Sequence, residues 1–200
     1  MLPEESQVRA VLLNSGGIDS RVAAAIASKG GWSLTSLYID NNPHNHDRAI
    51  RAAQRTADLY CTEHVVMPFP MDLTLLGDKR PSDKLPGAIG YSSIVTIVLG
   101  AAFARHRQID NVISGTKNDV WSGDGWKTHL QDLFSCFSLY SKGHTYFHTP
   151  VEEYKTVQMI VEKAKKLGVP LEDTVSCGHP TPCGICNKCT QRVKLGLPLC

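Results

Sequence analysis

Four cysteines near the end of this 200-residue chain have the spacing of a metal-binding site. Cys177, Cys183, Cys186 and Cys189 form the pattern C-x5-C-x2-C-x2-C. The two Cys-x2-Cys steps place thiolates on tight turns, where backbone amides can face the sulfurs. Four thiolates complete the tetrahedron that zinc prefers, and they leave no open position for water or substrate. We therefore predict a structural zinc ion held by these four residues.

Disulfides and an iron–sulfur cluster are the alternatives for the four cysteines. The chain has seven cysteines, an odd number, and Cys61, Cys136 and Cys200 lie outside the cluster. A secreted disulfide framework normally pairs its cysteines and is shorter than this chain. The first six residues contain neither a basic region nor an apolar run, so we expect no secretory signal peptide. Zinc is favoured over disulfides, and the sulfur spacing alone leaves iron open.

A glycine-containing loop near the N-terminus has residue types suited to binding phosphate. The string S-G-G-I-D-S lies between an expected strand and an expected helix. Glycines let backbone N–H groups turn towards an anion, and a helix N-terminus adds partial positive charge. The two serines add hydroxyl donors, and Asp19 could hold magnesium between phosphates or cap the helix. The residues expected to bind nucleotide phosphates are Asn14, Ser15, Gly16, Gly17, Ile18, Asp19 and Ser20.

Composition and motifs exclude several classes of protein. The loop lacks the Gly-Lys-Ser/Thr end of a Walker loop, which disfavours ordinary γ-phosphate transfer, and it lacks the G-x-G-x-x-G of a dinucleotide site. A formal charge of +2 gives no strong preference for nucleic acid. No apolar stretch approaches the roughly 20 residues that span a bilayer. We expect a cytoplasmic enzyme without a membrane partner.

Short apolar runs alternate with helical patterns along the chain, which is typical of a parallel α/β sheet. The expected strands are 8–13, 32–39, 64–67, 111–114 and 145–149. The expected helices are 21–29, 46–60, 91–106, 127–141 and 155–167. We interpret 71–90 as a loop or lid over the site, and 116–126 as a polar loop. The prediction is a doubly wound α/β domain over 1–170, with a four-cysteine zinc appendage at 171–200 packed on it.

The phosphate loop resembles that of the N-type ATP pyrophosphatases, which use ATP to adenylate a substrate oxygen and release pyrophosphate. Together with the cysteine tail, it resembles the 7-cyano-7-deazaguanine synthase (QueC-like) family of the queuosine pathway. Similarity extends over residues 8–196 and includes Asp40 followed by His46, and the string Leu167-Gly168-Val169-Pro170. The resemblance implies an adenine-nucleotide-alpha-hydrolase-like fold, a C-terminal zinc knuckle and a homodimer.

The same resemblance implies an ATP-dependent C–N ligase. Such an enzyme converts 7-carboxy-7-deazaguanine and ammonia to 7-cyano-7-deazaguanine through an acyl-adenylate, with magnesium accompanying ATP. Asp19 is one expected catalytic residue, as a magnesium ligand. Asp119 is a second, because loops at the carboxyl ends of parallel strands line the ligand crevice. Lys155 is the third, as a cation that could neutralise phosphate or carboxylate charge.

Several positions differ from the family pattern and support alternative functions. Arg21 stands where the family usually has a small hydroxyl residue, and the family's Gly-Arg-Asn is replaced at 90–92. Such differences favour a paralogue that activates or attaches a deazaguanine-like group on a protein or nucleic acid, in a modification or defence system. A sulfur-transfer enzyme acting on tRNA shares the loop, and would need Cys61 or Cys136 as its thiolate. The intact loop disfavours a zinc module that only binds RNA.

Overall fold

A single parallel sheet organises the fold. The structure is a computed structural model that describes residues 7–41, 44–69, 91–116, 132, 135 and 143–199. Within these ranges five parallel strands have the order β3-β2-β1-β4-β5. The strands are β1 (Arg9–Leu13), β2 (Ser33–Asp40), β3 (Glu63–Pro68), β4 (Asn111–Ser114) and β5 (Tyr146–His148). The helices are α1 (Ile18–Lys29), α2 (His46–Tyr60), α3 (Tyr91–His106), α5 (Val157–Leu167) and α6 (Asn187–Lys194). This arrangement confirms the predicted α/β fold class.

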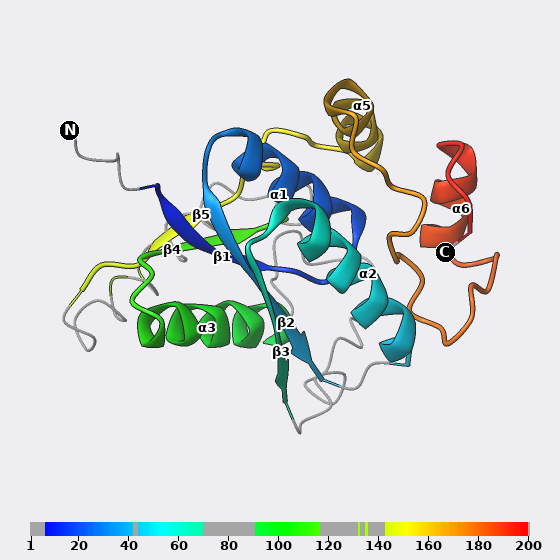
Figure 1. Ribbon diagram of the computed structural model, residues 1–200. Helices are drawn as coiled ribbons and strands as arrows, with labels where there is room; N and C mark the ends of the chain where they lie inside the picture. The colour runs from blue at the N-terminus through cyan, green and yellow to red at the C-terminus, as the bar shows by residue number, and fades with distance from the viewer. Residues whose placement is uncertain are drawn as a thin grey trace.

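Helices cover both faces of the sheet, as the buried apolar run of β1 predicts. Successive side chains of β1 point to opposite faces. Val11 and Leu13 pack in a cluster with α3, whereas Ala10 and Leu12 pack in a cluster with α1 and α5. Figure 1 shows α3 on one side of the sheet and α1 and α2 on the other. The strand order reverses between β1 and β4, and in such sheets ligands bind beyond the carboxyl ends of the strands at this point.

The helix ends follow their capping residues. α5 begins at Val157, two residues later than expected, because the Thr156 side chain accepts a hydrogen bond from the Met159 amide at 3.3 Å. It ends at Leu167, and the C-cap Gly168 has a φ of +67°, the left-handed conformation that glycine adopts readily. α1 begins at Ile18, three residues earlier than expected, directly after the phosphate loop. The bounds of α2 and α3 agree with the prediction.

Other expectations differ from the structure or lie outside it. The structure also contains the helix α6, which is absent from the expected helices. The expected loop at 71–90 lies outside the described residues, as does nearly all of the segment 116–141 with its expected polar loop and helix. The predicted boundary between the α/β domain (1–170) and the zinc appendage (171–200) stays a prediction. None of the helices that the structure describes has the length and apolar character needed to span a membrane.

Arg21 is a fully buried cation that joins three parts of the fold. Its guanidinium donates to Thr56 Oγ1 at 2.9 Å and to the Ala52 carbonyl at 3.1 Å, both in α2. It also donates to the Pro170 carbonyl at 3.1 Å and pairs with Asp173. Arg21 therefore ties α1 to α2 and to the segment that leads to the cysteines. This difference from the family pattern has a structural explanation that does not involve an acceptor pocket.

We expect Arg21→Ala to lower the free energy of unfolding by about 2–4 kcal/mol, because buried acceptors lose their donor and a cavity is left. Urea unfolding followed by circular dichroism measures the change. Arg55→Ala is the matched control, since Arg55 lies 3.7 Å from the same Asp173 but its side chain is 56% exposed. The control should change stability by less than about 1 kcal/mol. Equal losses in the two variants would contradict the structural role of Arg21.

Candidate active site and metal centre

The loop after β1 is held in a conformation that requires glycine. Gly16 has a φ of +72°, in the left-handed region. A Cβ atom at this position would lie 2.6 Å from the Ala49 carbonyl oxygen, so the loop packs directly against α2. On its other side, a Cβ atom on Gly115 would lie 2.5 Å from the Ser20 amide. The loop is therefore confined between α2 and the end of β4, at the point where the strand order reverses.

Buried hydrogen bonds from the neighbouring strands fix the loop. The Asn14 side chain donates to Ser36 Oγ at 2.9 Å and to the Ala53 carbonyl at 2.8 Å. Its Oδ1 accepts a hydrogen bond from the Gly16 amide at 3.1 Å. Ser36 Oγ lies 2.9 Å from His64 Nδ1, and burial lowers the pKa of His64 below its ordinary value. Asn14 is 2% exposed and these hydrogen bonds hold the loop in place, while its expected role in binding phosphate stays a prediction.

The hydroxyl groups of the loop differ in their environments. Ser15 is exposed, and its Oγ accepts from the Gly17 amide at 3.4 Å. Ser20 is buried and its hydroxyl donates to the Gly17 carbonyl at 3.1 Å. The two hydroxyl oxygens are 3.3 Å apart. Asp19 is half-buried in the first turn of α1. This arrangement offers an anion the amides of a helix N-terminus and places a carboxylate beside it, as a phosphate–magnesium site requires.

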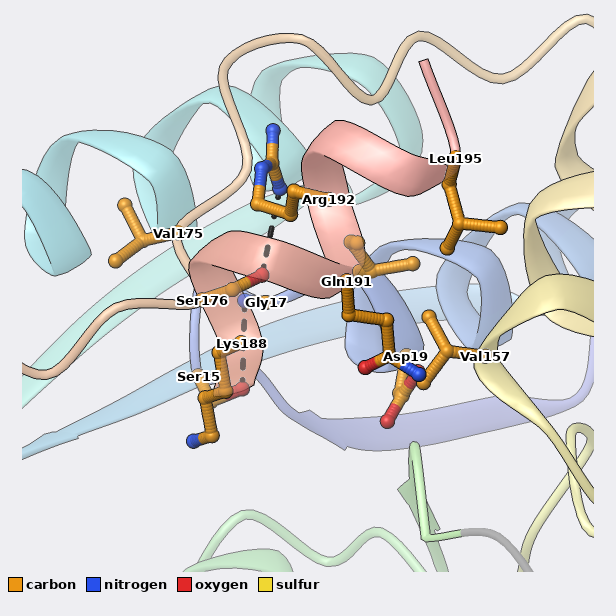
Figure 2. Close-up of a pocket in the computed structure, with 11 residues that line it drawn as sticks. Ser15, Gly17, Asp19, Val157, Val175, Ser176, Lys188, Gln191, Arg192 and Leu195 are labelled. Atoms are coloured by element: carbon orange, nitrogen blue, oxygen red, sulfur yellow. Dashed lines mark hydrogen bonds between the residues drawn. The ribbon is translucent and has the colours of Figure 1, made fainter. Parts of the chain in front are cut away.

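An open cavity of about 260 Å³ lies beside the loop. Loop residues form one wall, and α6 forms much of the opposite wall (Figure 2). The lining residues are Ser15, Gly17, Ile18, Asp19, Val157, Val175, Ser176, Lys188, Gln191, Arg192 and Leu195. The members from α6 and its C-cap residue Leu195 have the spacing of a single helix face, at positions 188, 191, 192 and 195. This spacing was visible in the sequence, but only if the segment was first recognised as a helix.

The C-terminal segment is fastened to the loop and to α2. The Val175 amide donates to the Gly16 carbonyl at 2.9 Å. The Asn45 side chain, just before α2, donates to the Cys177 carbonyl at 3.0 Å. Arg48 of α2 donates to the His179 carbonyl at 2.7 Å. The cysteine segment and α6 are thus placed beside the phosphate loop, although the two motifs lie at opposite ends of the sequence.

The buried side chain of Arg192 holds the C-terminal segment together through several hydrogen bonds. It is 2% exposed and donates to Thr174 Oγ1 at 2.8 Å, to Ser176 Oγ at 3.3 Å and to the Leu171 carbonyl at 3.2 Å. It also donates to the Pro198 carbonyl at 2.8 Å. One buried side chain therefore connects α6 to the residues on both sides of it.

The four predicted cysteines converge on one point. Their sulfurs all lie within 4.8 Å of one another, so they form a group that could hold a metal ion. The amides of Cys186 and Cys189 donate to the sulfurs of Cys183 and Cys186, both at 3.4 Å. These are the amide–sulfur contacts expected of Cys-x2-Cys turns.

The thiols of this group differ in how readily they ionise. Burial opposes ionisation of Cys177, but hydrogen bonds from the backbone of Cys183 and His179 outweigh it and lower its pKa to about 6. Burial and the neighbouring thiols raise the pKa of Cys189 to about 12. Four thiolates packed this closely need a cation to offset their charge, and metal ligation removes the thiol protons.

Of the three residues expected to be catalytic, one lines the cavity. Asp19 lies on the cavity wall. Lys155 is exposed and lies two residues before Val157, a lining residue, but it does not itself line the cavity. Asp119 lies outside the described residues. At the carboxyl end of β2, Asp40 Oδ1 lies 2.9 Å from His46 Nδ1, so this pair from the resemblance does meet in space.

Comparison with known proteins agrees with the motifs. The family model for the Queuosine biosynthesis protein QueC matches residues 88–196, and the model for the Thiamine biosynthesis protein (ThiI) matches residues 5–73. A 7-cyano-7-deazaguanine synthase of Synechococcus sp. (strain CC9311) is 31% identical over 207 residues, covering 92% of this chain and 90% of that protein. The chain belongs to the QueC family. The QueC model covers the cysteine segment, and the ThiI model covers the phosphate loop.

Solved structures support the fold of this QueC family member. An NMN synthetase from Francisella tularensis superposes with a TM-score of 0.52 at 19% identity, covering 98% of this chain and 74% of that one. The U34-tRNA thiolase NcsA from Methanococcus maripaludis, with its [4Fe-4S] cluster, superposes with a TM-score of 0.57 at 13% identity. That match covers 96% of this chain and 66% of the thiolase. At such identities the likeness concerns the fold alone.

We expect Ser36→Ala to loosen the phosphate loop and to lower the free energy of unfolding by about 1–3 kcal/mol, because Asn14 and His64 lose a shared buried partner. Hydrogen exchange measured by mass spectrometry should show faster exchange of the amides in residues 14–17. Ser33→Ala, at the first residue of the same strand, is the control and should leave that exchange unchanged. Unaltered loop exchange in Ser36→Ala would contradict the supporting role of this network.

Proposed function

We propose that this chain is an ATP-dependent C–N ligase that converts 7-carboxy-7-deazaguanine and ammonia to 7-cyano-7-deazaguanine. The observation that carries the proposal is the glycine loop, with its half-buried Asp19, on the wall of a cavity at the switch point of the sheet. The name of the curated relatives, 7-cyano-7-deazaguanine synthase, supports the proposed product.

The chemistry explains why a phosphate loop is needed. A carboxylate is a poor electrophile, so its oxygen first attacks the α-phosphorus of ATP, giving an acyl-adenylate and pyrophosphate. Ammonia then displaces AMP to form the amide. A second ATP adenylates the amide oxygen, and loss of AMP with two protons leaves the nitrile. Both activations release pyrophosphate, and donors fixed beside the developing negative charge lower the barrier to its departure.

The proposed residue roles follow from position. The amides at the start of α1, with Ser15 at the cavity wall, would bind the departing pyrophosphate. Asp19 would hold the magnesium ion that accompanies ATP, and bound magnesium would offset phosphate charge. Lys155, exposed just before α5, would neutralise charge at the edge of the site. Asp119 follows β4 in the sequence but lies outside the described residues, so its proposed catalytic role rests on the sequence alone.

For the cysteine group we propose a structural zinc ion. A Zn–S bond of about 2.3 Å sets the edge of a four-sulfur tetrahedron at about 3.8 Å. Three of the sulfur pairs, 177–183, 183–189 and 177–186, lie at 3.7, 3.9 and 3.9 Å. An iron–sulfur cube would hold its four thiolates much farther apart, because iron and sulfide ions lie between them. Four thiolates also leave no site for water, which supports a structural role.

Cys186→Ser should remove most of the bound zinc and lower the thermal midpoint of unfolding, because the proposed zinc ion loses one of its four ligands while serine can still cap α6. Metal content measured by plasma mass spectrometry should be about one zinc per chain in the unmodified protein. Cys61→Ser is the matched control and should keep its zinc. A variant that loses the metal yet unfolds at the original temperature would contradict the structural role, and iron in the unmodified protein would contradict zinc.

The activity is tested with purified protein, MgATP, ammonia and 7-carboxy-7-deazaguanine. We expect acid-dependent release of AMP and pyrophosphate, with the nitrile identified by mass spectrometry. Asp19→Ala should lower the rate about a hundredfold or more while the zinc content is retained. Asp47→Ala is the control, since Asp47 is also a first-turn acid, of α2, but its side chain is 82% exposed. A protein that neither binds nor turns over ATP would contradict the proposal.

Two alternatives give different results in the same assay. ATP binding without stimulation by the acid would favour a paralogue that acts on a protein or nucleic-acid acceptor. A sulfur-transfer enzyme would need a reactive thiolate, and burial raises the pKa of Cys61 to about 12, which disfavours that residue. Cys136 lies outside the described residues. The homodimer and the cytoplasmic location implied by the family remain expectations.

A further inference from the structure

The phosphate loop carries no cation of its own that faces the cavity. Residues 14–20 contain neither lysine nor arginine. Arg21 follows directly, but its guanidinium is buried against α2 and Asp173. A pyrophosphate group carries several negative charges, and nucleotide sites usually supply a lysine or arginine to offset them. A cation for this site must therefore come from another part of the chain.

Within the described residues, the cations that line the cavity come from α6. Lys188 and Arg192 both lie on the wall that faces the loop (Figure 2). The two differ in accessibility, since Arg192 is 2% exposed and donates to at least five oxygens of the C-terminal segment. Lys188 is exposed at the cavity, and within the described part of the chain its ammonium forms no salt bridge. Its charge is therefore available to a ligand.

The cysteine group determines where Lys188 lies. Cys186 is the N-cap residue of α6 and its sulfur accepts from the Cys189 amide at 3.4 Å, so Lys188 lies in a turn bounded by two of the four cysteines. The segment before them is joined to the loop by the Val175–Gly16 hydrogen bond. A metal ion on the four sulfurs would make this turn rigid, and the position of Lys188 relative to Ser15 would then be fixed before any ligand binds.

We propose that Lys188 is a phosphate-binding residue of the active site, and that the metal centre places it over the loop to bind the diphosphate that leaves ATP. This inference rests on the proposed function, since it assigns a further residue to the same site. The ammonium would form charge-assisted hydrogen bonds to oxygens held on their other side by the amides of α1. The cysteine knuckle would then serve substrate binding as well as stability.

The test is pyrophosphate binding, measured by titration calorimetry with magnesium at low ionic strength. Lys188→Gln should weaken binding about tenfold, the loss of one partly exposed charge-assisted contact. Lys188→Arg keeps the charge and should stay within about threefold of the unmodified protein. Lys194→Gln is the matched control, because Lys194 lies in the same helix but does not line the cavity, and it should leave the affinity unchanged.

The outcomes separate this inference from the proposed function. If the unmodified protein binds neither pyrophosphate nor MgATP, the nucleotide site itself is wrong and the inference falls with it. If the unmodified protein binds and Lys188→Gln binds equally well, the nucleotide site stands and the role of Lys188 is wrong. Zinc content is measured in each variant. If the Lys188→Gln variant loses zinc, the Lys188→Met variant is measured in its place. A pyrophosphate affinity of Lys188→Met equal to that of Lys188→Arg would overturn the inference.

Discussion

The hydrogen bond from the Val175 amide to the Gly16 carbonyl is the contact on which the site depends. It joins the two ends of the sequence at the tip of β1, where the strand order of the sheet reverses. Gly16 has a left-handed φ, and any side chain there would collide with α2, so this position requires glycine. Together with the hydrogen bonds from Asn45 and Arg48 to the cysteine segment, this bond makes the loop and α6 parts of a single cavity rather than separate motifs.

Two buried arginines stabilise that arrangement from opposite sides. Arg21 connects α1 and α2 to Pro170 and Asp173, and Arg192 connects α6 to Leu171 and Thr174. Burying a guanidinium is costly unless its donors are satisfied, and here they bond largely to carbonyl and hydroxyl oxygens of the same short segment. The segment before the cysteines is thus held by polar contacts that exist only in the folded state. Its position is coupled to the core of the domain.

Much of the fold could be predicted because its causes are local. Apolar runs identified the strands, and helical spacing placed α2 and α3 at their observed ends. The start of α5 was missed by two residues because the Thr156 cap overrides the periodic pattern. α6 was missed altogether, since it has only eight residues and its first turn is defined by Cys186. Recognising the cysteines as a metal site did not reveal the helix that starts among them.

The sequence alone determined the chemical groups of the site. Four cysteines at metal-ligand spacing and a glycine loop between a strand and a helix depend on short-range geometry, which is encoded in consecutive residues. Only the tertiary structure decided that Asn14 hydrogen-bonds to Ser36 and Ala53, that Arg21 is a structural cation, and that Lys188 lies on the cavity wall. These roles arise from contacts between residues far apart in the chain. Such contacts form only when the sheet has brought its strand ends together and the C-terminal segment has packed against them.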